Sequence, residues 1–140
     1  MEDAFAKQMG VDYTLAVSSC SAALFLSIKA SGISPKVSIL IPAFTFAAVP
    51  SAIIHADCLP ILCECGENYR IDLDDFRSKL ALADAVLISH MRGHTSDMDA
   101  ILAECEAVGK PVIEDAAHSL RTTWNGQMIG SFGKVGCFSF

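Results

Sequence analysis

Charged residues are scarce in this chain, and basic residues are scarcer than acidic ones. Only 19% of the 140 residues are Asp, Glu, Lys or Arg, whereas 52% are hydrophobic. Disordered segments lack such apolar content, so the composition predicts a folded chain with several elements buried on both faces. The 10 basic and 16 acidic residues give a net charge of -6, which offers no basic surface to nucleic acid or an anionic membrane. We therefore expect neither as a partner.

Sequence signals for secretion, membrane insertion and metal fingers are missing as well. The six cysteines follow no secretory signal and lie mostly in apolar runs, so we expect reduced thiols and a cytoplasmic protein. Cys63 and Cys65 form a C-x-C motif, but no second Cys or His pair stands at metal-finger spacing. The uncharged stretch 37–54 has the length of a membrane span, yet Pro42 and Pro50 interrupt it. We interpret it as two elements of a buried core.

Apolar runs of strand length alternate with segments of helical period along the chain. The expected strands are 14–19, 37–43, 59–64, 85–90, 110–115 and 135–140, and the expected helices are 21–30, 45–55, 72–80 and 97–108. Asn125-Gly126 predicts a hairpin. Repeated strand, helix, strand units with continuous apolar strands predict an α/β fold in three layers, a mostly parallel sheet covered by helices on both faces. The length suits one domain, and its abrupt ends lead us to expect a fragment of a longer protein.

Two of these strand ends carry residues that suit an anionic or aromatic ligand. In open parallel sheets, ligands bind beyond the carboxyl ends of the strands. Residues 18–22 lead from a strand into a helix start, where backbone N–H groups and serine hydroxyls suit a phosphate, although a simple helix cap by Ser18 or Ser19 is the alternative. Phe44 and Phe46 follow the next strand and can stack on a flat heterocycle or belong to the core.

The later strands add a carboxylate and two histidines. Asp115 ends an apolar strand, so it needs a cation or a strong donor, unless it serves as a helix cap. His90 ends the strand before it, and His118 follows Asp115 closely. A phosphate cup, an aromatic plate, a buried carboxylate and a histidine together suit pyridoxal 5′-phosphate (PLP), whose ring nitrogen Asp115 would keep protonated.

These residues also resemble those of a known family. The stretches that carry the resemblance are 16–24, 41–46, 97–101, 112–118 and 129–140. In sequence and in order they are similar to the DegT/DnrJ/EryC1/StrS aminotransferases. The combination of Glu-Asp-Ala-Ala-His, Gly-Ser-Phe-Gly and Phe-Ser-Phe is specific to that pattern, and the likeness covers essentially the whole chain.

The resemblance implies a fold, an activity and a set of cofactor contacts. It implies a PLP enzyme of fold type I, usually a homodimer, that moves an amino group from glutamate to a keto sugar nucleotide. Residues 1–140 would be part of the large PLP-binding domain, with the small C-terminal domain absent. The implied PLP contacts are the phosphate for Ser21, Ala22 and Ser139, the pyridine face for Phe46, the ring nitrogen for Asp115 and the phenolic oxygen for His118.

Three departures from the family pattern bear on function. Cys20-Ser21 stands where the family commonly has Gly-Thr, which keeps a hydroxyl and adds a thiol. Arg92 stands in a His-Met-Arg-Gly segment and is a candidate for a carboxylate or phosphate of the substrate, or a solvated arginine. The resemblance places the Schiff-base lysine about four positions beyond Phe140, and Lys134 does not match it. No catalytic residue is therefore expected within the chain, and we expect the 140 residues alone to be inactive.

Three alternative functions remain open at this point. Some relatives carry histidine in place of the lysine and remove a hydroxyl group from the sugar. A truncated or regulatory chain could keep the fold without catalysis. A metal-dependent hydrolase would need oxygen and nitrogen ligands, for which the candidates are His90, His94, Asp97, Asp99, Glu114 and His118.

Overall fold

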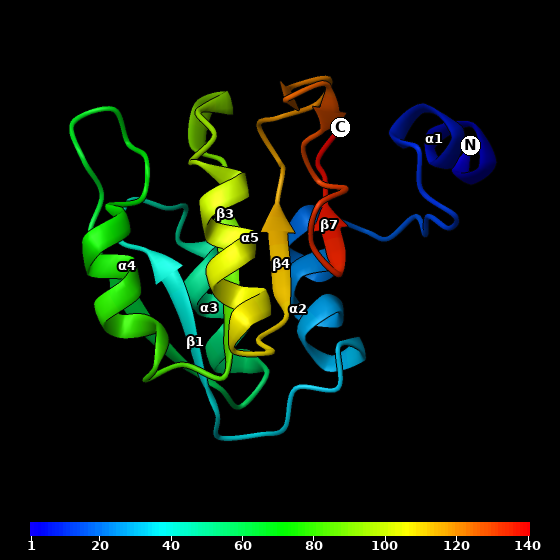
Figure 1. Cartoon of the computed structure of the whole chain (residues 1–140). Coiled ribbons are helices and arrows are strands. Elements are labelled where there is room, and N and C mark those ends of the chain that lie inside the picture. The colour runs from blue at the N-terminus through cyan, green and yellow to red at the C-terminus, as the bar shows by residue number, and fades with distance from the viewer.

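Five short apolar segments pair into one parallel sheet in the computed structural model, which describes residues 1–140 (Figure 1). The strands are β1 (Ser38–Pro42), β2 (Leu59–Cys63), β3 (Ala85–Ser89), β4 (Val112–Asp115) and β7 (Val135–Cys137). Their order across the sheet is β2-β1-β3-β4-β7, and every neighbouring pair is parallel. The predicted parallel sheet is confirmed.

Helices cover both faces of this sheet, because its central strands are apolar on both sides. All five residues of β3 are buried. Side chains such as Leu40 and Ile88 pack on one face with α4 (Leu73–Leu80) and α5 (Met98–Ala107). On the other face, neighbouring residues of the strands pack with α2 (Cys20–Ala30) and α3 (Ala48–His55). The structure thus has the expected three layers.

Helices α4 and α5 begin and end within one residue of the predicted bounds, whereas α3 begins at Ala48, three residues later than expected. The Asp72 side chain accepts hydrogen bonds from Asp74 N and Asp75 N, both at 3.0 Å, at the start of α4. Asp97 caps α5 in the same way by accepting from Ala100 N at 3.0 Å. Gly109 follows α5 with φ of 66°, a left-handed conformation that glycine adopts without strain. Local capping chemistry therefore sets these boundaries.

The start of the chain departs from the prediction. Residues 14–19 were expected to form a strand, but they have no regular secondary structure and pair with no strand of the sheet, and Leu15 is 77% exposed. Helix α1 (Glu2–Met9) precedes these residues and lies beyond β7 (Figure 1). Its Glu2 carboxylate accepts from Ala16 N at 2.7 Å, a side-chain bond in place of a β ladder. The prediction of a strand here is wrong because no neighbouring strand offers its backbone groups.

Near the end of the chain, the predicted hairpin is present, and the predicted last strand is shorter than expected. Thr123–Trp124 (β5) and Gln127–Met128 (β6) form an antiparallel hairpin. Asn125 and Gly126 have φ of 48° and 84°, so both central residues of the turn are left-handed, as a type I′ turn requires. Strand β7 ends at Cys137 rather than at residue 140.

The chain contains no helix with both the length and the apolar character needed to cross a membrane. The uncharged stretch 37–54 forms β1 and most of α3.

Candidate functional site

A cavity of about 330 Å³ opens at the carboxyl edge of the sheet. It lies where the strand order changes direction, because the chain leaves β1 towards β2 and then returns to β3 on the other side of β1. Such switch points are the usual ligand sites of open α/β sheets, and the volume falls within the range of about 300–1,000 Å³ for small-molecule sites. A larger groove of about 930 Å³ between α1 and β7 is lined mainly by hydrophobic residues. Most of the polar residues expected to bind a cofactor line the smaller cavity.

Five of the six residues with expected cofactor contacts line this one cavity. They come from four different segments of the chain, and they are Ser21, Phe46, Asp115, His118 and Ser139. The sixth, Ala22, lies just inside α2, and its backbone N–H donates to Ser19 Oγ at 3.1 Å. Cys20, Ser89 and Ala117 line the cavity as well. The sequence placed Cys20 in the expected phosphate segment, but it did not predict that Ser89 and Ala117 donate hydrogen bonds to Asp115.

The start of α2 gives the cavity a wall that suits an anion. Ser19 is the N-cap residue, and its side chain uses only the N–H of Ala22. The first N–H groups of a helix have no acceptor within the helix, and the helix dipole places positive potential there. The first turn of α2 carries no acidic residue. Ser21 adds a hydroxyl on the cavity side, so this wall can bind a phosphate group.

Asp115 is a buried carboxylate with neutral partners only. Its side chain is at the end of β4, and the residue is 5% exposed. Oδ2 accepts from Ser89 Oγ at 2.8 Å, and Oδ1 accepts from Ala117 N at 3.2 Å and from the Cys20 thiol at 3.8 Å. None of the ion pairs in the chain includes Asp115. A buried carboxylate without a cation is matched to a positively charged N–H donor from a ligand, such as a protonated pyridine nitrogen.

The two phenylalanines after β1 have different surroundings. Phe46 lines the cavity and is 63% exposed, so the face of its ring is available to a planar ligand. Phe44 instead stacks on Tyr69, with ring centroids 4.5 Å apart. Only Phe46 is therefore placed to act as the aromatic plate.

His118 is held by the backbone of the segment after β3. Its Nδ1 accepts from Arg92 N at 3.3 Å, and Arg92 has φ of 55°, in the left-handed region. With Nδ1 as the acceptor, Nε2 carries the proton of a neutral imidazole and can donate it to an oxygen of a ligand. Arg92 thus contributes to the site through its backbone N–H.

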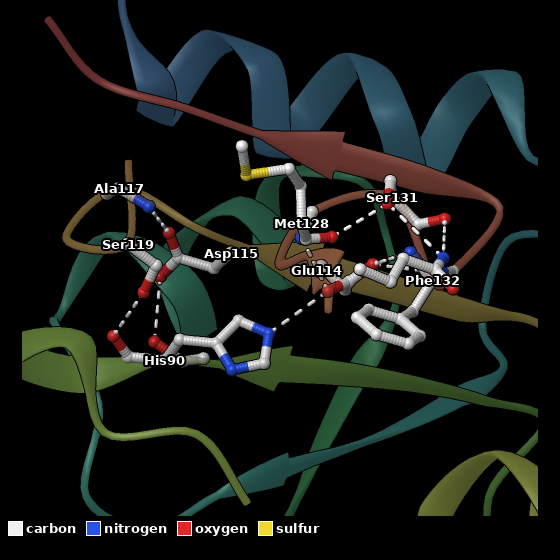
Figure 2. A network of polar contacts seen from close by, with 12 residues as sticks. His90, Glu114, Asp115, Ala117, Ser119, Met128, Ser131 and Phe132 are labelled. Carbon is white, nitrogen blue, oxygen red and sulfur yellow. Dashed lines mark hydrogen bonds and ion pairs between the residues drawn. The ribbon is translucent and has the colours of Figure 1, made fainter. Parts of the chain in front are cut away.

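Glu114 and His90 form a second polar network on the other side of β4 (Figure 2). Both side chains are fully buried, and His90 Nε2 lies 3.2 Å from Glu114 Oε2. The same oxygen accepts from Gly130 N at 2.8 Å, while Oε1 accepts from Phe132 N and Gly133 N at 2.7 Å each. Burial alone would raise the pKa of Glu114, but the hydrogen bonds from His90, Gly133 and Gly130 outweigh it and lower the pKa. This network fixes the turn that leads into β7.

The candidate metal ligands do not gather at one point, and only His90 and Glu114 contact each other. No three His, Cys, Asp or Glu side chains lie close enough together to hold a metal ion. Asp97 caps α5, Asp99 accepts from Asn125, and Glu114 is saturated by four donors. All six cysteines are free thiols, and four of them are buried. The geometry therefore gives no support to a metal-dependent hydrolase.

Curated relatives align with nearly all of this chain. The spore coat polysaccharide biosynthesis protein SpsC of Bacillus subtilis is 39% identical over 142 residues, which cover 99% of this chain and 36% of that protein. A UDP-N-acetyl-3-dehydro-alpha-D-glucosamine 3-aminotransferase of Acidithiobacillus ferrooxidans is 32% identical over 133 residues, which cover 94% of this chain and 36% of that protein. The chain thus spans just over a third of the length of these relatives.

Solved structures give the same result for the fold. The structure of 3-amino-5-hydroxybenzoic acid synthase superposes with a TM-score of 0.92 at 28% identity, over 99% of this chain and 37% of that one. The E. coli GDP-4-keto-6-deoxy-D-mannose-3-dehydratase, solved with bound hydrated PLP, gives a TM-score of 0.87 at 25% identity, over 98% and 37%. The family model of the DegT/DnrJ/EryC1/StrS aminotransferases matches residues 1–140. The chain belongs to the DegT/DnrJ/EryC1/StrS aminotransferase family, which implies dependence on PLP.

Proposed function

We propose that the protein is a PLP-dependent aminotransferase that transfers an amino group from glutamate to a keto sugar nucleotide. The observation that carries the proposal is Asp115, a buried carboxylate without a cationic partner that lines a cavity of about 330 Å³. A protonated pyridine nitrogen supplies the missing positive donor. Phe46, Ser21, Ser139 and the start of α2 surround the same cavity and match the other parts of PLP.

Each of these residues has a separate task in the proposal. Asp115 accepts the ring N–H and keeps that nitrogen protonated, which makes the bound ring an electron sink for the carbon that loses a proton. Phe46 stacks on the ring and excludes water from one face. His118 donates Nε2–H to the phenolic oxygen and fixes the rotation of the ring.

The phosphate would lie at the start of α2. Ser21 and Ser139 contribute hydroxyl groups there, and the helix contributes its first N–H groups and its dipole. The Ala22 N–H joins these donors if Ser19 Oγ releases it, because Ser19 now accepts that hydrogen bond at 3.1 Å. Binding would then exchange a helix cap for a ligand contact.

We propose that other parts of the whole protein complete the catalytic site. Residues 1–140 would form part of the large domain, and the lysine that removes and returns the proton would follow Phe140. A small C-terminal domain and a second copy of the chain in a homodimer would supply most sugar contacts. We place the enzyme in the cytoplasm, where nucleotide sugars are substrates. The relative from A. ferrooxidans supports this substrate class, because its name is that of a 3-aminotransferase for a 3-dehydro sugar linked to UDP.

A two-step assay tests the proposed reaction. The whole protein, purified with PLP, is mixed first with glutamate alone and then with a keto sugar nucleotide. We expect glutamate to bleach the visible absorption of the cofactor and release 2-oxoglutarate, and the sugar to restore the absorption and gain the amino group. If glutamate leaves the absorption spectrum of the cofactor unchanged, the proposed reaction is wrong.

The dehydratase reaction is the second candidate, because a dehydratase is among the structural neighbours of the chain. In the same assay, a dehydratase yields a deoxygenated sugar with no nitrogen transferred to it. Mass spectrometry of the sugar product separates the two reactions. Asp115→Ala should abolish either activity, and an Asp115→Ala enzyme with the wild-type cofactor spectrum and turnover would overturn the proposed role of this carboxylate.

A further inference from the structure

Three donors from three parts of the chain surround the Asp115 carboxylate. Ser89 lies directly opposite Asp115 in the register of β3 and β4, so the ladder brings its hydroxyl to Oδ2 at 2.8 Å. Cys20 is the first residue of α2, and its thiol lies 3.8 Å from Oδ1. Ala117 N completes the set at 3.2 Å from Oδ1, and Figure 2 shows Asp115 turned towards Ala117 and away from Glu114.

The two oxygens of the Asp115 carboxylate differ in how many hydrogen-bond donors they already accept from. Each carboxylate oxygen has two lone pairs. Oδ1 has two partners, Ala117 N and the Cys20 thiol, whereas Oδ2 has only Ser89. A charged N–H donor from a ligand can take the open position on Oδ2 or displace the weakest partner, which is the thiol.

We infer that Ser89 and Cys20 are positioning residues for Asp115: Ser89 fixes the rotation of the carboxylate, and Cys20 is the exchangeable partner that a ring N–H displaces. The inference rests on the proposed function for the identity of that N–H. The two side chains are suited to different tasks, because Ser89 is 8% exposed in a sheet ladder while Cys20 is half-buried on the cavity wall.

The Cys20 thiol has the properties of a weak hydrogen-bond donor that a stronger donor can displace from Asp115. Burial first, and then the negative charge of Asp115, raise the pKa of the Cys20 thiol to about 12, so it stays protonated at neutral pH and can donate. The titratable groups that face Cys20 are Asp115 from β4 and Cys137 from β7, and His90 and His118 line the same cavity. A neutral thiol is a weak donor compared with a pyridinium N–H, so exchange favours the cofactor.

The test of Cys20 needs no cofactor. Alkylation of Cys20 by iodoacetamide in the PLP-free whole protein is followed by peptide mass spectrometry across the alkaline pH range. Asp115→Asn removes the charge that helps to keep the thiol protonated, so the Cys20 rate at about pH 9 should rise, by about tenfold for each pKa unit that this charge contributes. The rate for Cys65, which does not line the cavity, should stay constant. An unchanged Cys20 profile would overturn the role of Cys20.

The test of Ser89 measures PLP binding by equilibrium dialysis. Ser89→Ala should raise the dissociation constant for PLP about tenfold, because it removes a hydrogen bond to a charged group, and Ser89→Thr should restore it by keeping the hydroxyl. The matched control is Ser31→Ala, since Ser31 is equally buried, has no side-chain partner and lies outside the cavity. If Ser89→Ala binds PLP as tightly as Ser31→Ala, or if threonine does not restore binding, the role of Ser89 is wrong.

The two tests separate this inference from the proposed function. If the wild-type protein binds PLP, Ser89→Ala binds it equally well and Asp115→Asn leaves the alkylation profile of Cys20 unchanged, the proposed function stands and the inference is wrong. A wild-type protein that binds no PLP loses the proposed function, and the alkylation profile then still decides whether Cys20 and Asp115 are coupled.

Discussion

Replacement of Glu114 by alanine should destabilise the protein more than almost any other single substitution on the sheet. The carboxylate is fully buried, and each of its oxygens accepts two hydrogen bonds. The substitution leaves the backbone N–H groups of Gly130, Phe132 and Gly133 and the imidazole N–H of His90 without their acceptor. Stabilisation by the whole network is therefore lost at once.

The size of the loss follows from these contacts. An unsatisfied buried donor costs about 1–3 kcal/mol, but water can reach the half-buried N–H groups of Phe132 and Gly133 and reduce their share. A hydrogen bond to a charged group contributes about 1.5–3 kcal/mol. We therefore expect Glu114→Ala to lower the free energy of unfolding by about 4 kcal/mol. Glu114→Gln should lose at least about 2 kcal/mol, because its NH2 group must face two N–H donors.

Urea unfolding of the whole protein, followed by far-ultraviolet circular dichroism, measures this loss. Glu106→Ala is the matched control, because Glu106 is an exposed glutamate of α5 without a side-chain bond, and its substitution should change stability by less than about 0.5 kcal/mol. Glu114→Ala with a midpoint and slope like those of Glu106→Ala would refute the reasoning.

Two further predictions concern pH and packing. The pKa of Glu114 in the folded protein lies below its ordinary value of 4.5. The contribution of its ionised form to folding stability is therefore complete above pH 4.5 and is lost as the pH falls through the folded pKa. In thermal melts from pH 6 to pH 3, acid should lower the melting temperature of the wild type more than that of Glu114→Ala. Gly136→Ala should prevent correct folding, since the added Cβ would lie 2.0 Å from Gly130 O, whereas Gly10→Ala meets no atom within 4 Å and should lose only about 1 kcal/mol through its positive φ. Soluble expression and melting temperature compare the two glycine variants.

The layered fold could be predicted because burial on both faces leaves a direct mark on the sequence. A strand such as Ala85–Ser89, covered by helices on both sides, is a continuous apolar run, and aspartates such as Asp97 mark where the helices begin. The residues 14–19 carry a similar apolar pattern but have no partner strand in this chain, so the pattern alone predicted a strand wrongly.

The cavity was predictable for a topological reason, whereas its inner contacts were not. Parallel strands end at one edge of the sheet, so residues that follow different strands, such as Phe46, Asp115 and Ser139, meet there. The bond from Ser89 to Asp115 depends on the register between two strands, which no local pattern encodes. Glu114 was considered only as a metal ligand, and its true role could not be predicted. Its partners are mostly backbone N–H groups of a later turn, and no side chain in the sequence marks such contacts.

A crystal structure of the whole protein with PLP tests the central claim most directly. We expect PLP in the cavity beside Asp115, with the ring nitrogen within hydrogen-bond distance of the Asp115 carboxylate, the ring against Phe46 and the phosphate at the start of α2 beside Ser21. A cofactor bound elsewhere, or bound in this cavity with its ring nitrogen away from Asp115, would contradict the account.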